Sequence, residues 1–132
     1  MENKIIIYCD GGSRGNPGKS AAAFVVVEGG KVVYSQANYL GIETNNFAEY
    51  SAVLAALNWV GGNKDKLNKE IMFNLDSELV VKQINGLYKV KNVKLKEIHM
   101  NIKNILENLQ TKIIFKNISR EKNAKADFLV NQ

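Results

Sequence analysis

The order of strand-like and helix-like segments is the feature that most limits the folds open to this chain. Residues 4–9 (KIIIYC), 22–28 (AAFVVVE) and 31–40 (KVVYSQANYL) are apolar and rich in β-branched residues, which is typical of strands. The pair Gly29-Gly30 between the last two is typical of a two-residue hairpin turn. We therefore expect three antiparallel strands at the start of the chain.

Helices and strands alternate in the rest of the chain. Apolar residues recur at helical spacing in the longer helices, and the expected order is helix 46–60, strand 71–75, helix 77–84, helix 95–109, strand 112–115 and helix 124–130. Crossovers that follow an antiparallel meander imply an α/β fold, with helices flanking a mixed five-stranded sheet. We expect a single domain, residues 1–132, because no linker-like segment divides the chain.

Composition indicates a cytoplasmic protein that does not enter a membrane. The one cysteine, Cys9, cannot form an internal disulfide, which suits a reducing compartment. No apolar run approaches the length that a bilayer span needs, and the N-terminus lacks the pattern of an export signal. A monomer is the default expectation.

The charge of the chain is unevenly distributed. Residues 1–81 carry 7 Lys/Arg and 9 Asp/Glu, whereas residues 82–125 carry 11 Lys/Arg and 3 Asp/Glu, a net charge of +8. Such asymmetry suggests a polyanionic partner such as nucleic acid. A solvated, lysine-rich surface without a partner would produce the same pattern.

The segment DGGSRGNPGKS at 10–20 ends like a phosphate-binding P-loop but does not fit one. That loop needs four residues between its first glycine and the Gly-Lys pair, and Gly12 and Gly18 are separated by five. It must also open onto a helix, and the β-branched residues that follow favour a strand. The segment therefore serves to place Asp10, at the end of the first expected strand.

Four acidic residues lie at the ends of expected elements. Asp10 and Asp76 each follow a strand, Glu49 lies in the first turn of helix 46–60, and Asp127 lies in the first turn of the last helix. Each has an ordinary alternative: a turn for Asp10, a capping box from Asn46 for Glu49, a helix cap for Asp76 and the helix dipole for Asp127. If the two central strands are neighbours, however, all four carboxylates meet.

Four carboxylates in one partly buried site would repel one another unless cations neutralise them. Mg²⁺ prefers oxygen ligands of this kind, and two such ions would hold an in-line displacement at phosphorus. Zinc does not fit, since no His or Cys residues cluster nearby.

The motifs DGGSRGNPG, TNNFAEY, DSELVVKQING and SREKNAKADFLVN resemble, in order and spacing, the type 1 ribonuclease H family. The resemblance implies a ribonuclease H-like fold and endonucleolytic hydrolysis of the RNA strand of an RNA–DNA hybrid, which leaves 3′-hydroxyl and 5′-phosphate ends. It implies two Mg²⁺ ions, with Mn²⁺ as a substitute. Asp10 would contact both ions, Asp127 the ion that activates water, and Glu49 and Asp76 the ion beside the departing 3′-oxygen.

The resemblance also implies contacts with the hybrid, where turn and cap chemistry is the alternative. Asn16 and Asn45 match residues that contact the minor groove, and Thr44 and Asn46 match a pocket for a phosphate of the DNA strand. The implied substrate-binding residues are Gly11, Gly12, Ser13, Asn16, Thr44, Asn45 and Asn46.

Two features depart from the family pattern. The loop before the last helix lacks the histidine that many members carry, and Arg120 stands there instead; it is our hypothesis for a catalytic cation, with a structural arginine as the alternative. The only histidine, His99, lies on the amphipathic helix 95–109, where we expect a surface or rim position. The segment 87–94 is too short for the basic protrusion of longer members, so we expect a short form with modest, salt-sensitive affinity for hybrid.

Two other functions remain open at this point. A binding module that has lost catalysis would not need four acids. A related two-metal nuclease acting on DNA would use the same acids but would fit the TNN and GNPG segments less well.

Overall fold

The three strands expected at the start of the chain form an antiparallel meander in the computed structural model, which describes residues 4–63, 69–109 and 111–131. They are β1 (Lys4–Arg14), β2 (Gly18–Glu28) and β3 (Lys31–Glu43). Gly29 and Gly30 form the turn between β2 and β3, with φ angles of 61° and 78°. The predicted hairpin is therefore confirmed.

The remaining elements follow in the predicted order, with a short 3₁₀ helix added before the last helix. They are α1 (Asn45–Gly61), β4 (Glu70–Leu75), α2 (Glu78–Ile84), α3 (Val93–Asn108), β5 (Ile113–Asn117), the 3₁₀ helix η2 (Arg120–Asn123) and α4 (Ala124–Val130). β4 pairs parallel with β1, and β5 pairs parallel with β4, so the strand order is β3-β2-β1-β4-β5. The predicted α/β fold with a mixed five-stranded sheet is confirmed. The predicted domain 1–132 includes residues 1–3, 64–68, 110 and 132, which lie outside the described residues.

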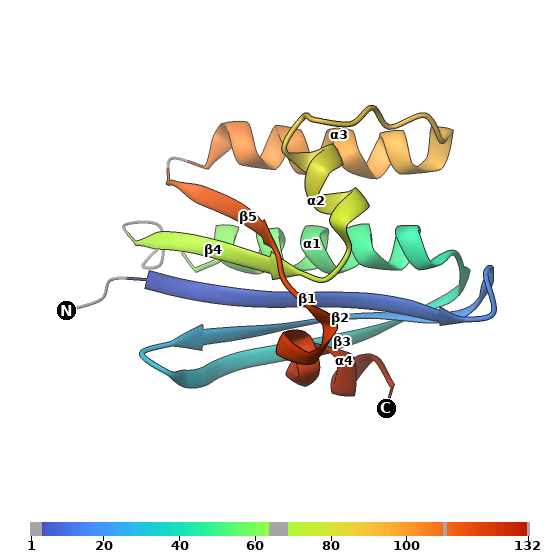
Figure 1. Ribbon diagram of the computed structural model, residues 1–132. Helices are drawn as coiled ribbons and strands as arrows, with labels where there is room; N and C mark the ends of the chain where they lie inside the picture. The colour runs from blue at the N-terminus through green and yellow to red at the C-terminus, as the bar shows by residue number, and fades with distance from the viewer. Residues whose placement is uncertain (1–3, 64–68, 110, 132) are drawn as a thin grey trace.

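Helices cover both faces of the sheet (Figure 1). α1, α2 and α3 lie on one side, and α4 lies on the other, against β1 and β2. Alternate residues of β1 (Ile5, Ile7 and Cys9) are fully buried in the core on the α1 side. β2 is buried on both faces, which explains its continuous apolar sequence. Within the described ranges, no helix is both long and apolar enough to cross a bilayer.

The predicted ends of the first three strands are wrong. β1 does not stop at Cys9 but continues to Arg14, so Asp10 lies inside a strand and not at its end. β2 begins at Gly18, four residues before the predicted start, and β3 continues to Glu43. The reason is pairing: β1 and β2 hydrogen-bond as far as the Arg14–Lys19 pair, and this ladder holds glycine and serine residues in extended conformation. The strand that starts at Gly18 also confirms that the segment 10–20 is not a P-loop.

Gly11 allows β1 and α1 to approach closely. A Cβ atom at this position would lie 2.2 Å from the carbonyl carbon of Ala48 and 2.5 Å from the backbone nitrogen of Glu49. Because both are backbone atoms in the first turns of α1, a side chain would have to push the helix away from the strand. The next residue, Gly12, would place its Cβ 3.6 Å from a side-chain atom of Val130, which is ordinary contact.

This difference makes Gly11→Ala and Gly12→Ala a matched pair of variants. We expect Gly11→Ala to lower the free energy of unfolding by about 3 kcal/mol, since the clash involves backbone that cannot turn aside. Gly12→Ala should change it by less than about 1 kcal/mol. Urea denaturation of the two variants and the wild type measures both. Equal stability of the two variants would contradict the close approach.

Candidate active site

Asp10 and Asp76 lie side by side because of the parallel pairing of β1 and β4. The last paired residues of the two strands are Cys9 and Leu75. Asp10 comes directly after Cys9, and Asp76 comes directly after Leu75. The two aspartates therefore lie at the same end of the β1–β4 pairing. Among the described strands, β1 pairs beyond this point with β2 alone, and α1 packs against it.

Glu49 comes to this edge from the second turn of α1. The backbone N–H of Gly11 donates a 2.7 Å hydrogen bond to Glu49 Oε1. The capping-box alternative for Glu49 is wrong, because the N-cap of α1 is Thr44, whose Oγ1 accepts from the N–H of Phe47 at 3.1 Å. The Glu49 carboxylate therefore accepts a hydrogen bond from β1 and does not cap the N-terminus of α1.

Asp76 and Asp127 come from different elements: Asp76 directly follows β4, and Asp127 lies in α4. The cap alternative for Asp76 is wrong, since Ser77 is the N-cap of α2 and its Oγ accepts from the N–H of Val80 at 3.3 Å. Asp127 lies in the first turn of α4, where the helix dipole favours a negative charge. Its Oδ1 accepts a long 3.5 Å hydrogen bond from Asn131.

Three of the four carboxylates form a tight cluster. One oxygen from each of Asp10, Glu49 and Asp76 lies within 4.8 Å of the other two. Asp10 is 4% exposed and Glu49 is 5% exposed, so water screens their repulsion weakly. Asp127 is half-buried and lies outside this tight group, but it lines the same cleft.

The electrostatics of the cluster are those of crowded carboxylates. Burial raises the pKa of Asp10 to about 7, and the charges of Asp76 and Asp127 add to the rise. Burial also raises the pKa of Glu49, with a further contribution from Asp10, and burial raises that of Asp76. All three groups therefore hold protons more tightly than isolated carboxyl groups do.

The donor set fits a hard divalent cation. Glu49 Oε2 and Asp76 Oδ2 are buried, and neither has a hydrogen-bond partner among the described residues. Orphaned carboxylate oxygens are costly, and both belong to residues of the carboxylate cluster. Mg²⁺ and Mn²⁺ bind sites of this type, whereas Zn²⁺ sites in proteins use His and Cys, which the cluster lacks.

The cleft around the cluster has a volume of about 520 Å³. All four acids line it, together with Arg120 and five of the predicted substrate-binding residues: Gly11, Gly12, Ser13, Asn45 and Asn46. The other two predicted residues, Asn16 and Thr44, lie outside its lining.

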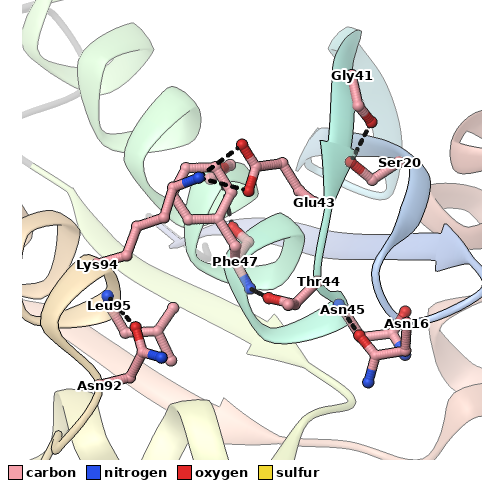
Figure 2. A network of polar contacts seen from close by, with 11 residues as sticks. Asn16, Ser20, Gly41, Glu43, Thr44, Asn45, Phe47, Asn92, Lys94 and Leu95 are labelled. Carbon is pink, nitrogen blue, oxygen red and sulfur yellow. Dashed lines mark hydrogen bonds and ion pairs between the residues drawn. The ribbon is translucent and has the colours of Figure 1, made fainter.

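The predicted contact residues hold the β1–β2 loop against the start of α1. Asn45 Oδ1 accepts from the N–H of Ser13 at 2.8 Å, and the N–H of Asn45 donates to Asn16 Oδ1 at 3.0 Å, as Figure 2 shows for the second bond. The side-chain oxygens of Asn16 and Asn45 are thus used within the protein. Their amino groups have no partner in the part of the chain that the structure describes, so they are free to donate.

Lys94, in the first turn of α3, differs from the lysines of the short segment that precedes this helix. Its ammonium group pairs with both oxygens of Glu43, at 2.7 and 2.9 Å, and lies 4.6 Å from the ring centre of Phe47 (Figure 2). It therefore connects α3 to the start of α1. Lys89 and Lys91 are exposed and have no ion pair within the described ranges.

Arg120 and His99 take different positions relative to the site. Arg120 is exposed on η2 and lines the cleft, and its charge lowers the pKa of Asp76. His99 is half-buried on α3, where its Nε2 lies 3.1 Å from the carbonyl oxygen of Gln83. It is a rim residue that joins α3 to α2, as the sequence predicts.

Asn123 is a site residue that the sequence analysis missed. It is fully buried between η2 and α4, and its Nδ2 donates a 2.8 Å hydrogen bond to the carbonyl oxygen of Cys9. A hydrogen bond from its side chain also lowers the pKa of Asp76. One side chain therefore connects the start of α4 to both strands that carry acids. The only sign of this role in the sequence is that Asn123 lies four residues before Asp127.

Comparison with known proteins gives consistent matches. A family model described as RNase H matches residues 2–132. The Ribonuclease HI of Halobacterium salinarum is 34% identical over 130 residues, which are 98% of this chain and 63% of that protein. The Bifunctional protein Rv2228c of Mycobacterium tuberculosis is 34% identical over 131 residues, which are 97% of this chain and 35% of that protein. The chain thus spans less than two thirds of the length of these curated relatives.

A solved structure matches over nearly its whole length. The crystal structure of LC11-RNase H1 in complex with an RNA/DNA hybrid is 43% identical, with a TM-score of 0.91, and the match covers 96% of this chain and 94% of that one.

The raised pKa of Asp10 predicts how stability depends on pH. The folded state holds the proton of Asp10 up to about pH 7, whereas the unfolded state releases it near pH 4. The contribution of Asp10 to stability is therefore complete below about pH 4 and is lost as the pH rises from there through about 7. The metal-free wild type should therefore lose stability between pH 5 and 8. Asp10→Asn, which cannot ionise, should lose about 2 kcal/mol less over this range.

Thermal denaturation in a chelator, repeated with Mg²⁺ at pH 8, measures this effect. Mg²⁺ should raise the midpoint of the wild type by several degrees and that of Asp10→Asn much less. Glu97→Gln, at an exposed position on α3, is the control and should follow the wild type. The same pH dependence in Asp10→Asn and the wild type would contradict the crowded cluster.

Proposed function

The chain belongs to the ribonuclease H family, as its motifs predict, and we propose that it hydrolyses the RNA strand of RNA–DNA hybrids. The observation that carries the proposal is the cluster of Asp10, Glu49 and Asp76, with two orphaned oxygens, in a cleft that Asp127 also lines. The similarity to LC11-RNase H1, whose structure holds an RNA/DNA hybrid, supports hybrid as the substrate.

In the proposed reaction, water attacks a phosphodiester of the RNA strand and the bond from phosphorus to the 3′-oxygen breaks. The products carry a 5′-phosphate and a 3′-hydroxyl, the leaving oxygen having taken up a proton. Two Mg²⁺ ions, for which Mn²⁺ can substitute, would supply activation of the water and neutralisation of the leaving oxygen. Asp10 would help to hold these ions, because one of its oxygens lies within 4.8 Å of an oxygen of Glu49 and of Asp76, and Asp127 lines the same cleft.

Recognition of the RNA strand is assigned to the asparagines beside the cleft. The 2′-hydroxyl distinguishes RNA from DNA, and it both donates and accepts hydrogen bonds. The unpartnered amino groups of Asn16 and Asn45 can donate to it, and their fixed carbonyl oxygens hold the loop in place. The start of α1, at Thr44 and Asn46, is suited to a phosphate of the DNA strand because helix N-termini bind anions.

We further propose that the protein acts as a monomer in the cytoplasm. The single buried thiol of Cys9 is suited to a reducing compartment, and burial raises its pKa and keeps it unreactive.

Cleavage of matched duplexes tests the function. With Mg²⁺, we expect the wild type to cut the RNA of an RNA–DNA hybrid and to leave duplex DNA intact. Asp10→Asn should lower the rate by at least about a thousandfold, since it removes the central carboxylate. Binding without cleavage in either metal would indicate a binding module. Equal cleavage of duplex DNA would indicate a DNA nuclease.

Arg120 is proposed to bind the scissile phosphate or the leaving group, because it lines the cleft and cannot act as a base. Arg120→Ala should lower kcat by about tenfold, and Arg120→Lys should recover part of the loss. Lys122→Ala, a neighbouring exposed cation outside the cleft lining, is the matched control. A wild-type kcat for Arg120→Ala would refute the proposed role.

A further inference from the structure

The cleft extends beyond the four acids onto a part of the sheet to which the proposed function assigns no role. Its lining there includes Arg14 from β1, Lys19 from β2 and Tyr39 from β3. We call these three residues the cationic arm. None of them belongs to the carboxylate cluster or to the contact between the β1–β2 loop and α1.

The register of the strands places the cationic arm on one face. Arg14 and Lys19 are directly opposite each other in the antiparallel ladder, so their side chains point to the same face. Asp10 and Arg14 are four residues apart on β1 and also share this face. The separation along an extended strand is about 13 Å, so the arm lies more than one nucleotide away from the acids.

The register of β3 places Tyr39 at the cleft, next to a bulge. Ala21 pairs with Tyr39 and Ser20 pairs with Gly41, so Leu40 is an extra residue in β3. Leu40 packs against the core, while Tyr39 lines the cleft and is 70% exposed. The Ser20 hydroxyl donates a 3.0 Å hydrogen bond to the Gly41 carbonyl and holds the bulge in place (Figure 2).

The arm lacks partners within the protein. In the described part of the chain, Arg14 and Lys19 form no ion pair, and Tyr39 has no hydrogen bond or ring contact. Like charges opposite each other across a ladder destabilise a sheet. Two uncompensated cations beside an exposed aromatic ring therefore indicate an external ligand that is anionic and has apolar faces.

We propose that the cationic arm is a second binding site for the strand that is cut, one or more nucleotides away from the phosphodiester at the acids. Arg14 and Lys19 neutralise phosphates, and the ring of Tyr39 packs against a base or sugar. This proposal rests on the proposed function, because it takes the nucleic acid to be anchored at the carboxylate cluster. It assigns the arm a role in affinity and not in the chemical step.

The experiment measures hybrid binding in the Asp10→Asn background, by fluorescence anisotropy at several salt concentrations. Tyr39→Ala should weaken binding by about tenfold, and Tyr39→Phe should retain wild-type affinity because it keeps the ring. Arg14→Ala/Lys19→Ala should reduce the slope of log affinity against log salt by between about 1 and 2. Lys31→Ala/Lys103→Ala removes two exposed lysines outside the cleft and is the matched control.

Shortening the hybrid separates the arm from the rest of the site. A duplex that ends before it reaches the arm should bind the arm variants and their parent equally well. If the arm variants bind a long hybrid with the parent's affinity and salt slope, the arm proposal is wrong, whether or not the parent enzyme cleaves RNA. If the enzyme with an intact Asp10 fails to cut hybrid in the cleavage assay, the proposed function fails independently.

Discussion

The contact between Gly11 and the first turns of α1 is the constraint on which the rest of the site depends. Without a side chain at position 11, the backbone of β1 lies against Ala48 and Glu49, and the Gly11 N–H binds the Glu49 carboxylate. The parallel pairing of β1 with β4 brings Asp76 to the same place from the other side. Three carboxylates are thus forced together by backbone packing and not by attraction between them.

That arrangement opposes folding. Burial and mutual repulsion raise the pKa of Asp10 and Glu49, and two carboxylate oxygens have no partner among the described residues. The fold tolerates the cost because the core around β1, β2 and α1 is extensive and closely packed. Bound cations would relieve this repulsion, so the proposed cofactor would also stabilise the fold.

Local sequence patterns predicted the order and type of the helices and strands correctly. They did not predict where some strands end or the role of Asn123 in the site. The Gly29-Gly30 turn and α4 at Ala124–Val130 were correct. The end of β1 was wrong, because glycine and serine have weak strand preference and only pairing with β2 extends the strand. The role of Asn123 was missed because its partners, Cys9 and Asp76, are distant in the chain.

The amino-acid sequence alone determined the order of elements, the helical and strand periodicities and the positions of the four acids, because these depend on neighbouring residues and on their spacing. Only the tertiary structure decided which acids crowd together, that Asn16 and Asn45 use their oxygens within the protein, and that Tyr39 faces the cleft. These outcomes depend on strand register and on the close approach of a helix. Each of them is set by contacts between residues far apart in the chain, which no local pattern encodes.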